Sequence, residues 1–175
     1  MKIVNKSTNS NCSNTNYSET ACGFVVFFNK EVSSMQMRNT NTNVGGYPAT
    51  QVYDYLKNTL YNQLPSDLKS VIVNTRVISE ASDGGTNYTT NDKLYLLSGT
   101  EATGENYYDQ IYGYTRHLDY YYQSRDFTSS VSTDIWLRSA NSQDTERFII
   151  VGGPGILDSS LATASHAVVP AFRIG

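Results

Sequence analysis

The last forty residues limit the possible folds more than any other part of the chain. Three short apolar runs follow one another there, namely IWLRSA (Ile135–Ala140), RFIIVGG (147–153) and AVVPAFRIG (167–175). Each run is bounded by Gly, Pro, Ser or Asn, and runs of this length with such boundaries are typical of strands. Three of them in close succession predict one meander of sheet strands.

Length and composition narrow the class of protein. A chain of 175 residues fits one domain with its own core. The formal net charge is -3 and no Lys/Arg cluster stands out, so nucleic acid is not an expected partner. No apolar run approaches the ~18 residues that cross a bilayer, so membrane insertion is not expected either. Only 17% of the residues are charged, which predicts the uncharged polar surface common outside cells.

The N-terminus lacks the apolar stretch of a signal peptide, since MKIVNKSTNSNC is almost entirely polar. Residues 1–22 as a whole are poor in periodicity and are expected to be a polar N-terminal arm or linker. We expect an extracellular, cell-surface or virion location, which the protein would reach as part of a longer precursor, in a virion or by lysis.

The chain has only two cysteines and two histidines, which are few ligands for a structural metal site. Cys12 and Cys22 lie ten residues apart, and a disulfide between them would stabilise the fold by ~2 to 3 kcal/mol. Two free thiols are equally compatible with the sequence, because the compartment is unknown. Structural zinc needs four ligands, and neither His117 nor His166 lies at a ligand spacing from the cysteines. We therefore expect no metal and no cofactor.

Periodicity predicts helices in the first half of the chain. Residues 23–29 form a short apolar run, which predicts a buried strand. From Ala49 onward, apolar residues recur at intervals of three and four and predict an amphipathic helix that ends before Pro65. Ser66 is expected to cap a second, short helix.

The middle of the chain is less regular. Strands are predicted at 73–79 and 93–98, with an exposed loop at 80–92 between them. Residues 100–126 hold seven tyrosines and predict irregular structure with one or two short helices. The fold class is therefore α+β, with helices early and strands late.

Five motifs in a fixed order resemble a bacterial domain of unknown function. Members of that family show a WWLRSP strand and a closing GVRPAF strand. The matching segments here are MRNTNTNVGGY (37–47), LYNQLPSDLKSVI (60–72), TTNDKLYLLSGTE (89–101), IWLRSA and VVPAFRIG (168–175). The resemblance covers residues 23–175. Each motif is weak singly, but the five together are specific.

The resemblance implies a single C-type-lectin-like domain over residues 23–175, with two early helices packed on a small, twisted, mainly antiparallel sheet and long polar loops. It also implies a module of surface or secreted proteins of Gram-positive bacteria or their phages. The chain departs from the family pattern at Tyr47, Ile135, Ala140 and Val169 and is therefore a divergent member.

Four residues of these motifs have a structural role in either interpretation. Trp136, Pro170 and Phe172 are expected to fill the core from central strands. Arg138 is expected to be half buried, with its stem packed and its guanidinium bonded to backbone carbonyls or to a carboxylate. Contact between Arg138 and a ligand is the alternative.

The residues do not predict catalysis. Calcium-dependent sugar binding is not predicted either, because the Glu-Pro-Asn and Gln-Pro-Asp tripeptides of calcium-dependent lectins do not occur. The candidate acid-base pairs, Asp144 with Glu146 and Asp83 with Asp92, lie in polar loops where solvated carboxylates are expected. We therefore predict that the protein is not an enzyme.

Polar loops and tyrosines predict a contact surface. The segments 139–147 and 152–166 join the late strands, and we expect both loops to be displayed at one end of the sheet. Tyrosine offers rigid, amphipathic contact area, although each ring could instead pack on the sheet. The residues predicted to contact a ligand are Asn141, Gln143, Asp144, Arg147, Tyr120 and Tyr122.

Two functions follow from this surface. The first is an adhesin or receptor-binding module that recognises a glycan or protein on a cell. The second is a structural module of a phage tail, a fibre or a cell-surface array, as a homo-oligomer or as part of a larger assembly. The sequence does not separate them.

Overall fold

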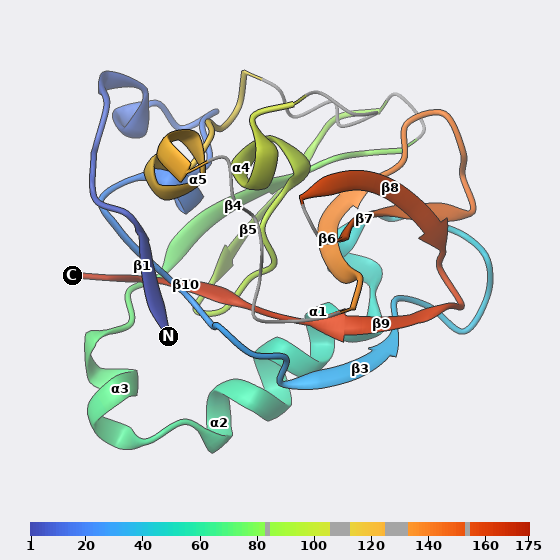
Figure 1. Ribbon diagram of the computed structural model, residues 1–175, viewed down its shortest axis with the longest axis horizontal. Helices are drawn as coiled ribbons and strands as arrows, with labels where there is room; N and C mark the ends of the chain where they lie inside the picture. Colours follow the sequence, from blue (N-terminus) through green and yellow to red (C-terminus); the bar gives the residue numbers. More distant parts are fainter. Residues whose placement is uncertain (83–84, 106–112, 125–132, 153–154) are drawn as a thin grey trace.

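The described residues form three β-sheets and a few short helices (Figure 1). The computed structural model describes residues 1–82, 85–105, 113–124, 133–152 and 155–175. The mixed α+β class predicted from the sequence is confirmed. The strands are β1 (Lys2–Asn5), β2 (Phe24–Phe27), β3 (Ser33–Gln36), β4 (Thr75–Ser79), β5 (Tyr88–Asp92), β6 (Ile135–Ala140), β7 (Arg147–Gly152), β8 (Ile156–Leu161), β9 (Ser165–Val168) and β10 (Ala171–Ile174).

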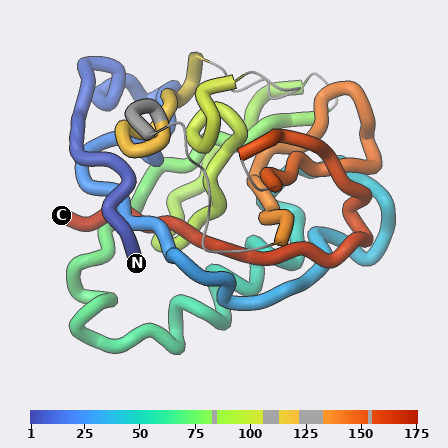
Figure 2. The backbone as a smooth tube through the Cα atoms, viewed as in Figure 1, coloured from blue at the N-terminus to red at the C-terminus, as the bar shows by residue number. Residues whose placement is uncertain are grey.

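The sheets differ in size and in strand direction. One has the order β1-β2-β10 and is antiparallel, and another is the antiparallel hairpin β4-β5. The largest has the order β3-β9-β6-β7-β8, in which β6 and β9 run parallel and the other neighbours are antiparallel. Both chain ends lie on the same side of the molecule, because β1 and β10 flank β2 (Figure 2).

The early helix was predicted correctly. It consists of α1 (Gln51–Asp54), a π-helical stretch η4 (Tyr55–Leu60) and α2 (Tyr61–Gln63). The side chain of Thr50 caps it by accepting a hydrogen bond from the Tyr53 N–H at 3.0 Å. Val52, Leu56 and Leu60 are all buried, so the apolar stripe faces the core as its spacing predicts.

The other α-helices in the described part of the chain are α3 (Ser66–Val71), α4 (Gly99–Thr103) and α5 (Asp119–Ser124). Short 3-10 helices are η1 (Ser10–Ser13), η2 (Glu19–Ala21) and η3 (Tyr47–Ala49). The prediction that Ser66 caps α3 was wrong. Pro65 occupies the cap position without a side-chain bond, and Ser66 is already the first helical residue. The helices α4 and α5 lie in the tyrosine-rich segment, where one or two short helices were expected.

Alternating side chains of the central strands supply two hydrophobic cores. Ile135 and Leu137 of β6 belong to one core and Trp136 to the other, and the same alternation holds along β2, β7 and β10. Residues of α4 and α5 join the first core, whereas α1 and η4 join the second. Figure 1 shows these two groups of helices on opposite sides of the strands. The apolar runs are continuous because both faces of these strands are covered.

The C-terminal strands differ from the predicted meander in two respects. The run 167–175 is divided at Val169 and Pro170, so that β9 joins the five-stranded sheet and β10 joins the three-stranded one. The segment 152–166, expected to be a displayed loop, contains β8. Its sequence ILDSSL is polar because most of the strand is at least partly exposed, and only Leu157 is buried.

Two predictions for the middle of the chain were also wrong. Residues 93–98 are extended but form only an isolated bridge, Tyr95 with Ala171, because their other backbone groups bond elsewhere. Leu94 and Leu96 still face one core while Tyr95 and Leu97 face the other. The expected loop 80–92 holds β5, which pairs with β4.

Residues 1–22, expected to be a polar arm or linker, pack on the rest of the molecule. The strand β1 pairs with β2, and Val4 and Tyr17 are buried. Asp119 accepts hydrogen bonds from the N–H groups of Lys6 and Ser7, both at 3.0 Å. A disulfide joins Cys12 to Cys22, so the structure has the bonded pair and not two free thiols.

Three of the four motif residues given structural roles lie in or beside the core. Trp136 and Phe172 are 0% and 1% exposed, and the Trp136 indole N–H donates to the Met35 carbonyl at 2.8 Å. Pro170 lies between β9 and β10, and its carbonyl accepts a hydrogen bond from the Phe28 N–H at 3.0 Å.

Glycine at position 46 is required by the turn that delivers the first helix. Gly46 has φ +59°, and a Cβ there would lie 2.6 Å from the Glu80 carbonyl oxygen. We predict that Gly46→Ala lowers the free energy of unfolding by about 3 kcal/mol or more, through backbone strain and overlap together. Urea denaturation measures this loss.

The matched control is Gly113→Ala, because Gly113 has φ +94° but, apart from its chain neighbours, no atom of the described residues lies within 4 Å of the position that a Cβ would take there. Only backbone strain of about 1–2 kcal/mol is expected for this variant. Equal losses for the two variants would show that packing around Gly46 is not the constraint.

Candidate ligand-binding site

Arg138 has the structural role predicted for it and not the alternative role of a ligand contact. Arg138 is 0% exposed and forms a two-pronged ion pair with Glu101, with both N···O distances 2.6 Å. Its guanidinium also donates to the carbonyls of Ile78 at 3.0 Å and Leu96 at 2.9 Å. The expected bonding to carbonyls or a carboxylate is therefore what the structure shows, and the burial is complete instead of partial.

Local irregularity in β6 puts Arg138 in this place. The pairing of β6 with β7 is interrupted between Trp136 and Ala140, and the Arg138 N–H donates instead to the Leu97 carbonyl at 2.9 Å. This turns β6 toward residues 94–97 and α4. A bulge of this kind changes the direction of a side chain without ending the strand.

Glu101 is held by the start of α4. The Ser98 hydroxyl accepts from the Glu101 N–H, and the Glu101 carboxylate accepts from the Ser98 N–H, which is a capping box. The hydroxyl groups of Thr20 and Thr115 also donate to this carboxylate. Burial raises the pKa of Glu101, but Arg138 and these hydrogen bonds outweigh it and hold the pKa below its ordinary value.

No signal in the sequence identifies Glu101 as the partner of Arg138. The capping-box pattern Ser-x-x-Glu at 98–101 was a readable signal for the helix start. It does not reveal that the same carboxylate pairs with an arginine 37 residues away.

The turn between β6 and β7 holds four of the six predicted contact residues. Asn141 is buried, and its side-chain oxygen accepts from the Gln143 N–H at 2.8 Å. Gln143 is exposed. Asp144 and Arg147 form an ion pair at 3.0 Å with side chains 41% and 38% exposed, and Arg147 also donates to the Ser159 carbonyl at 3.1 Å.

A single buried amide fixes this turn. The Asn43 side-chain nitrogen donates to the carbonyls of Asn141, Asp144 and Arg147 at 2.8 to 3.1 Å. The Asn43 backbone N–H donates to the Thr145 carbonyl at 2.6 Å. The turn is therefore rigidly attached to the segment before Gly45, and sequence reasoning had not singled out Asn43.

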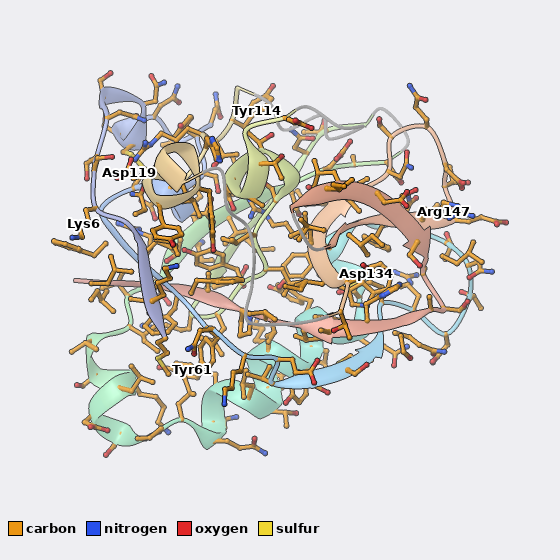
Figure 3. All side chains as sticks on the ribbon, in the orientation of Figure 1. Lys6, Tyr61, Tyr114, Asp119, Asp134 and Arg147 are labelled. Carbon is orange, nitrogen blue, oxygen red and sulfur yellow. A yellow bond between two sulfur atoms is a disulfide. The ribbon has the colours of Figure 1, made fainter. Side chains whose placement is uncertain are left out.

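The other two predicted contact residues lie elsewhere. Tyr120 of α5 is half-buried, packs against the first core and lies under Lys2, whose Nζ is 3.4 Å from the ring centroid. It lines a groove of about 610 Å³ together with residues 3–7 and Asp119. Figure 3 shows Asp119 and Arg147 at opposite sides of the molecule, so the six residues do not form one site. The side chain of Tyr122 lies outside the described residues.

A second hollow was not predicted. It has a volume of about 470 Å³ and includes Tyr114, which is 42% exposed. Its lining residues come from separate parts of the chain: Asn16, Ile78, Gly85, Thr86, Asn87, Thr89 and Tyr114. Of the tyrosines predicted to make a contact surface, Tyr107, Tyr108 and Tyr112 lie outside the described residues.

One carboxylate expected to be solvated is buried. Asp92 is 4% exposed and accepts hydrogen bonds from the Tyr53 hydroxyl at 2.9 Å and the Thr90 hydroxyl at 2.5 Å. Burial raises the pKa of Asp92 above its ordinary value, and burial together with Asp92 raises the pKa of Tyr53 to about 12. The Asp83 of the predicted pair lies outside the described residues.

The described residues contain no group of three or more His, Cys, Asp or Glu side chains that could hold a metal ion. His166 donates to or accepts from the Ser160 hydroxyl at 2.7 Å and packs edge-on against Trp136. Within the described ranges, no helix has the length and apolar character needed to span a bilayer.

The buried ion pair leads to a stability prediction. Glu101→Gln leaves the Arg138 guanidinium buried without a full counter-charge, which we expect to cost about 3–5 kcal/mol in urea denaturation at neutral pH. Glu31→Gln, at an exposed position, should change stability by less than about 0.5 kcal/mol. The double variant Glu101→Leu with Arg138→Met should lose less stability than either Glu101→Leu or Arg138→Met alone. Strictly additive losses of stability would contradict the pairing.

The pH dependence has a definite sign. A carboxylate whose folded pKa lies below its unfolded value of about 4.5 contributes stability above that pH and loses it as the pH falls through the folded pKa. We therefore expect the wild-type protein to lose stability below about pH 4.5 more steeply than Glu101→Gln. Parallel acid-denaturation curves for the two proteins would contradict this expectation.

Comparison with known proteins gives one family. A family model described as a domain of unknown function, DUF6273, matches residues 22–175. No curated protein and no solved structure matches the chain. The matched region contains nine of the ten strands and all of the α-helices described above, and it is consistent with the resemblance to a domain of unknown function. The chain belongs to the DUF6273 family of domains of unknown function.

Proposed function

We propose that this protein is a non-enzymatic binding module, an adhesin or receptor-binding domain that recognises a glycan or a protein on a cell surface. The observation that carries the proposal is the β6–β7 turn, which presents exposed polar side chains on a backbone that Asn43 fixes from within. Recognition loops are commonly exposed segments positioned by a rigid scaffold.

The chemistry of the turn suits a contact surface. Gln143 and Glu146 are exposed, and the partly exposed pair of Asp144 and Arg147 lies beside them. Amide, carboxylate and guanidinium groups together can bond the hydroxyl groups of a glycan or the backbone of a protein. A turn that is already ordered loses little conformational entropy on binding, which favours affinity.

The proposal includes a C-type-lectin-like arrangement and a location outside the cell or on a virion. Helices on both sides of antiparallel strands and the long polar connections support the first part. The disulfide between Cys12 and Cys22 supports the second, because such bonds persist in oxidising environments.

One observation favours the alternative, a structural module of a phage tail, fibre or cell-surface array. Ile3, Phe24 and Val71 are 44%, 50% and 42% exposed, and they come from β1, β2 and the end of α3. Ile174 of β10 pairs with Phe24 and is also partly exposed. Exposed apolar side chains on neighbouring strands are typical of a contact between subunits.

Variants of the turn test the proposed function. Labelled protein would be applied to a printed glycan array and to intact bacterial and animal cells. We expect Gln143→Ala with Glu146→Ala to reduce binding about tenfold or more, as loss of central contacts does. The matched control, Gln63→Ala with Glu105→Ala, removes the same residue types from other exposed positions and should bind like wild type.

Sedimentation velocity of the same proteins separates the two functions. A monomer that binds cells or glycans supports the receptor-binding module. A stable oligomer that Phe24→Asp dissociates, without binding to either probe, would favour the assembly module. Equal binding by the turn variant and its control would overturn the assignment of the turn.

A further inference from the structure

We propose that the hollow beside Tyr114 is a binding site for an uncharged saccharide unit. This site shares no residue with the β6–β7 turn, so the inference goes beyond the function proposed for that turn. The hollow of about 470 Å³ lies within the range of about 300–1,000 Å³ that is usual for ligand pockets.

The lining suits a neutral, hydroxyl-rich ligand. Asn16 and Asn87 contribute side-chain amides, and Thr86 and Thr89 contribute hydroxyl groups. These groups can both donate and accept hydrogen bonds, as the hydroxyl groups of a sugar also do. None of the described residues that line the hollow has a charged side chain, so it offers no counter-ion to a carboxylate or a phosphate.

Tyr114 supplies an aromatic surface beside these polar groups. The residue is 42% exposed although it lines the hollow, so part of the ring is available for contact. The face of an aromatic ring carries partial negative charge and attracts the C–H groups of a pyranose. Gly85 has no side chain, which allows the backbone at that edge to approach a ligand closely.

Hydrogen bonds hold two walls of the hollow, the one at Asn16 and the one at Tyr114. The Ser18 N–H donates to the Tyr114 carbonyl at 2.7 Å, which ties the two walls together. Asn16 lies within the loop that the disulfide closes, and Arg76 of β4 donates to the Asn14 carbonyl at 3.0 Å in that loop. Thr115, next to Tyr114, is buried and donates to Glu101.

This arrangement gives the disulfide a positioning role. Breaking the bond between Cys12 and Cys22 removes the covalent restraint on the loop that carries Asn16 and leaves it held by hydrogen bonds alone. If the loop were then ordered for about one tenth of the time, the apparent affinity would fall about tenfold. The disulfide therefore keeps one wall of the site in its binding geometry.

The test uses the whole 175-residue protein, isotope-labelled for NMR, and soluble sugars as probes. Glucose, galactose, mannose, N-acetylglucosamine and their disaccharides would be titrated separately, with glucuronic acid as the charged comparison. We expect at least one neutral sugar to shift the amide signals of Asn16, Asn87 and Tyr114 in a saturable manner. Glucuronic acid should bind more weakly than glucose.

Four variants make the test specific. Tyr114→Ala should weaken the neutral sugar about tenfold, whereas Tyr114→Phe keeps the ring and should bind nearly as well. Tyr61→Ala removes a tyrosine from another part of the surface and should leave binding unchanged (Figure 3). Thr86→Val provides a second variant of the hollow in case Tyr114→Ala fails to fold.

The outcomes separate this site from the turn. Sugar binding that survives in the Gln143→Ala, Glu146→Ala protein supports an independent site, even if that protein no longer binds cells. The proposal is overturned if no neutral sugar shifts signals at the hollow, if glucuronic acid binds more tightly, or if Tyr114→Ala and Thr86→Val, once folded, bind like wild type.

Discussion

A single buried ion pair determines how distant parts of this chain meet. Arg138 of β6 and Glu101 of α4 neutralise each other where water is excluded, and every remaining polar group around them must then find a partner. The Arg138 guanidinium donates to the carbonyls of Ile78 and Leu96. The Glu101 carboxylate accepts from the hydroxyl groups of Thr20 and Thr115. Strand β4, the extended segment at 94–97 and the N-terminal loop are thus held around one guanidinium group. A buried pair adds little net stability, because removing both charges from water is itself costly.

The elements that could be predicted from the sequence are those in which the spacing of the apolar residues matches a buried face. The stripe of Val52, Leu56 and Leu60 predicted the first helix, because one face of that helix is buried. The elements that were missed have polar sequences. Strand β8 (ILDSSL) lies at the edge of its sheet with little burial, so it shows no apolar run, and β5 (YTTND) forms a similarly open hairpin with β4. Residues 93–98 were predicted to be a strand but are not part of a sheet. Their apolar side chains face two different cores in alternation, and this produces the strand-like pattern.

The candidate site could be predicted only in part, for a related reason. The role of Arg138 follows from an arginine placed within an apolar strand, but its partner Glu101 is 37 residues away and no sequence pattern links the two. Asn141 lies in a segment that the sequence predicts to be a displayed loop, yet it is buried, and its carbonyl accepts a hydrogen bond from Asn43 of another segment. Tyr120 was grouped with the same turn although α5 places it against β1. The hollow beside Tyr114 unites three separate segments, and no spacing rule connects them.

The position of Thr20 has a consequence for what counts as the domain. The family match begins at residue 22, yet Thr20 and Ser18 are fully buried, and the Thr20 hydroxyl reaches the carboxylate at the centre of the molecule. Strand β1 likewise extends a sheet whose other two strands lie inside the match. The residues that the family model matches and the residues that pack together in the structure therefore differ at the N-terminal end. Ser18 and Thr20, which lie outside the family match, are therefore part of the packed interior of the domain.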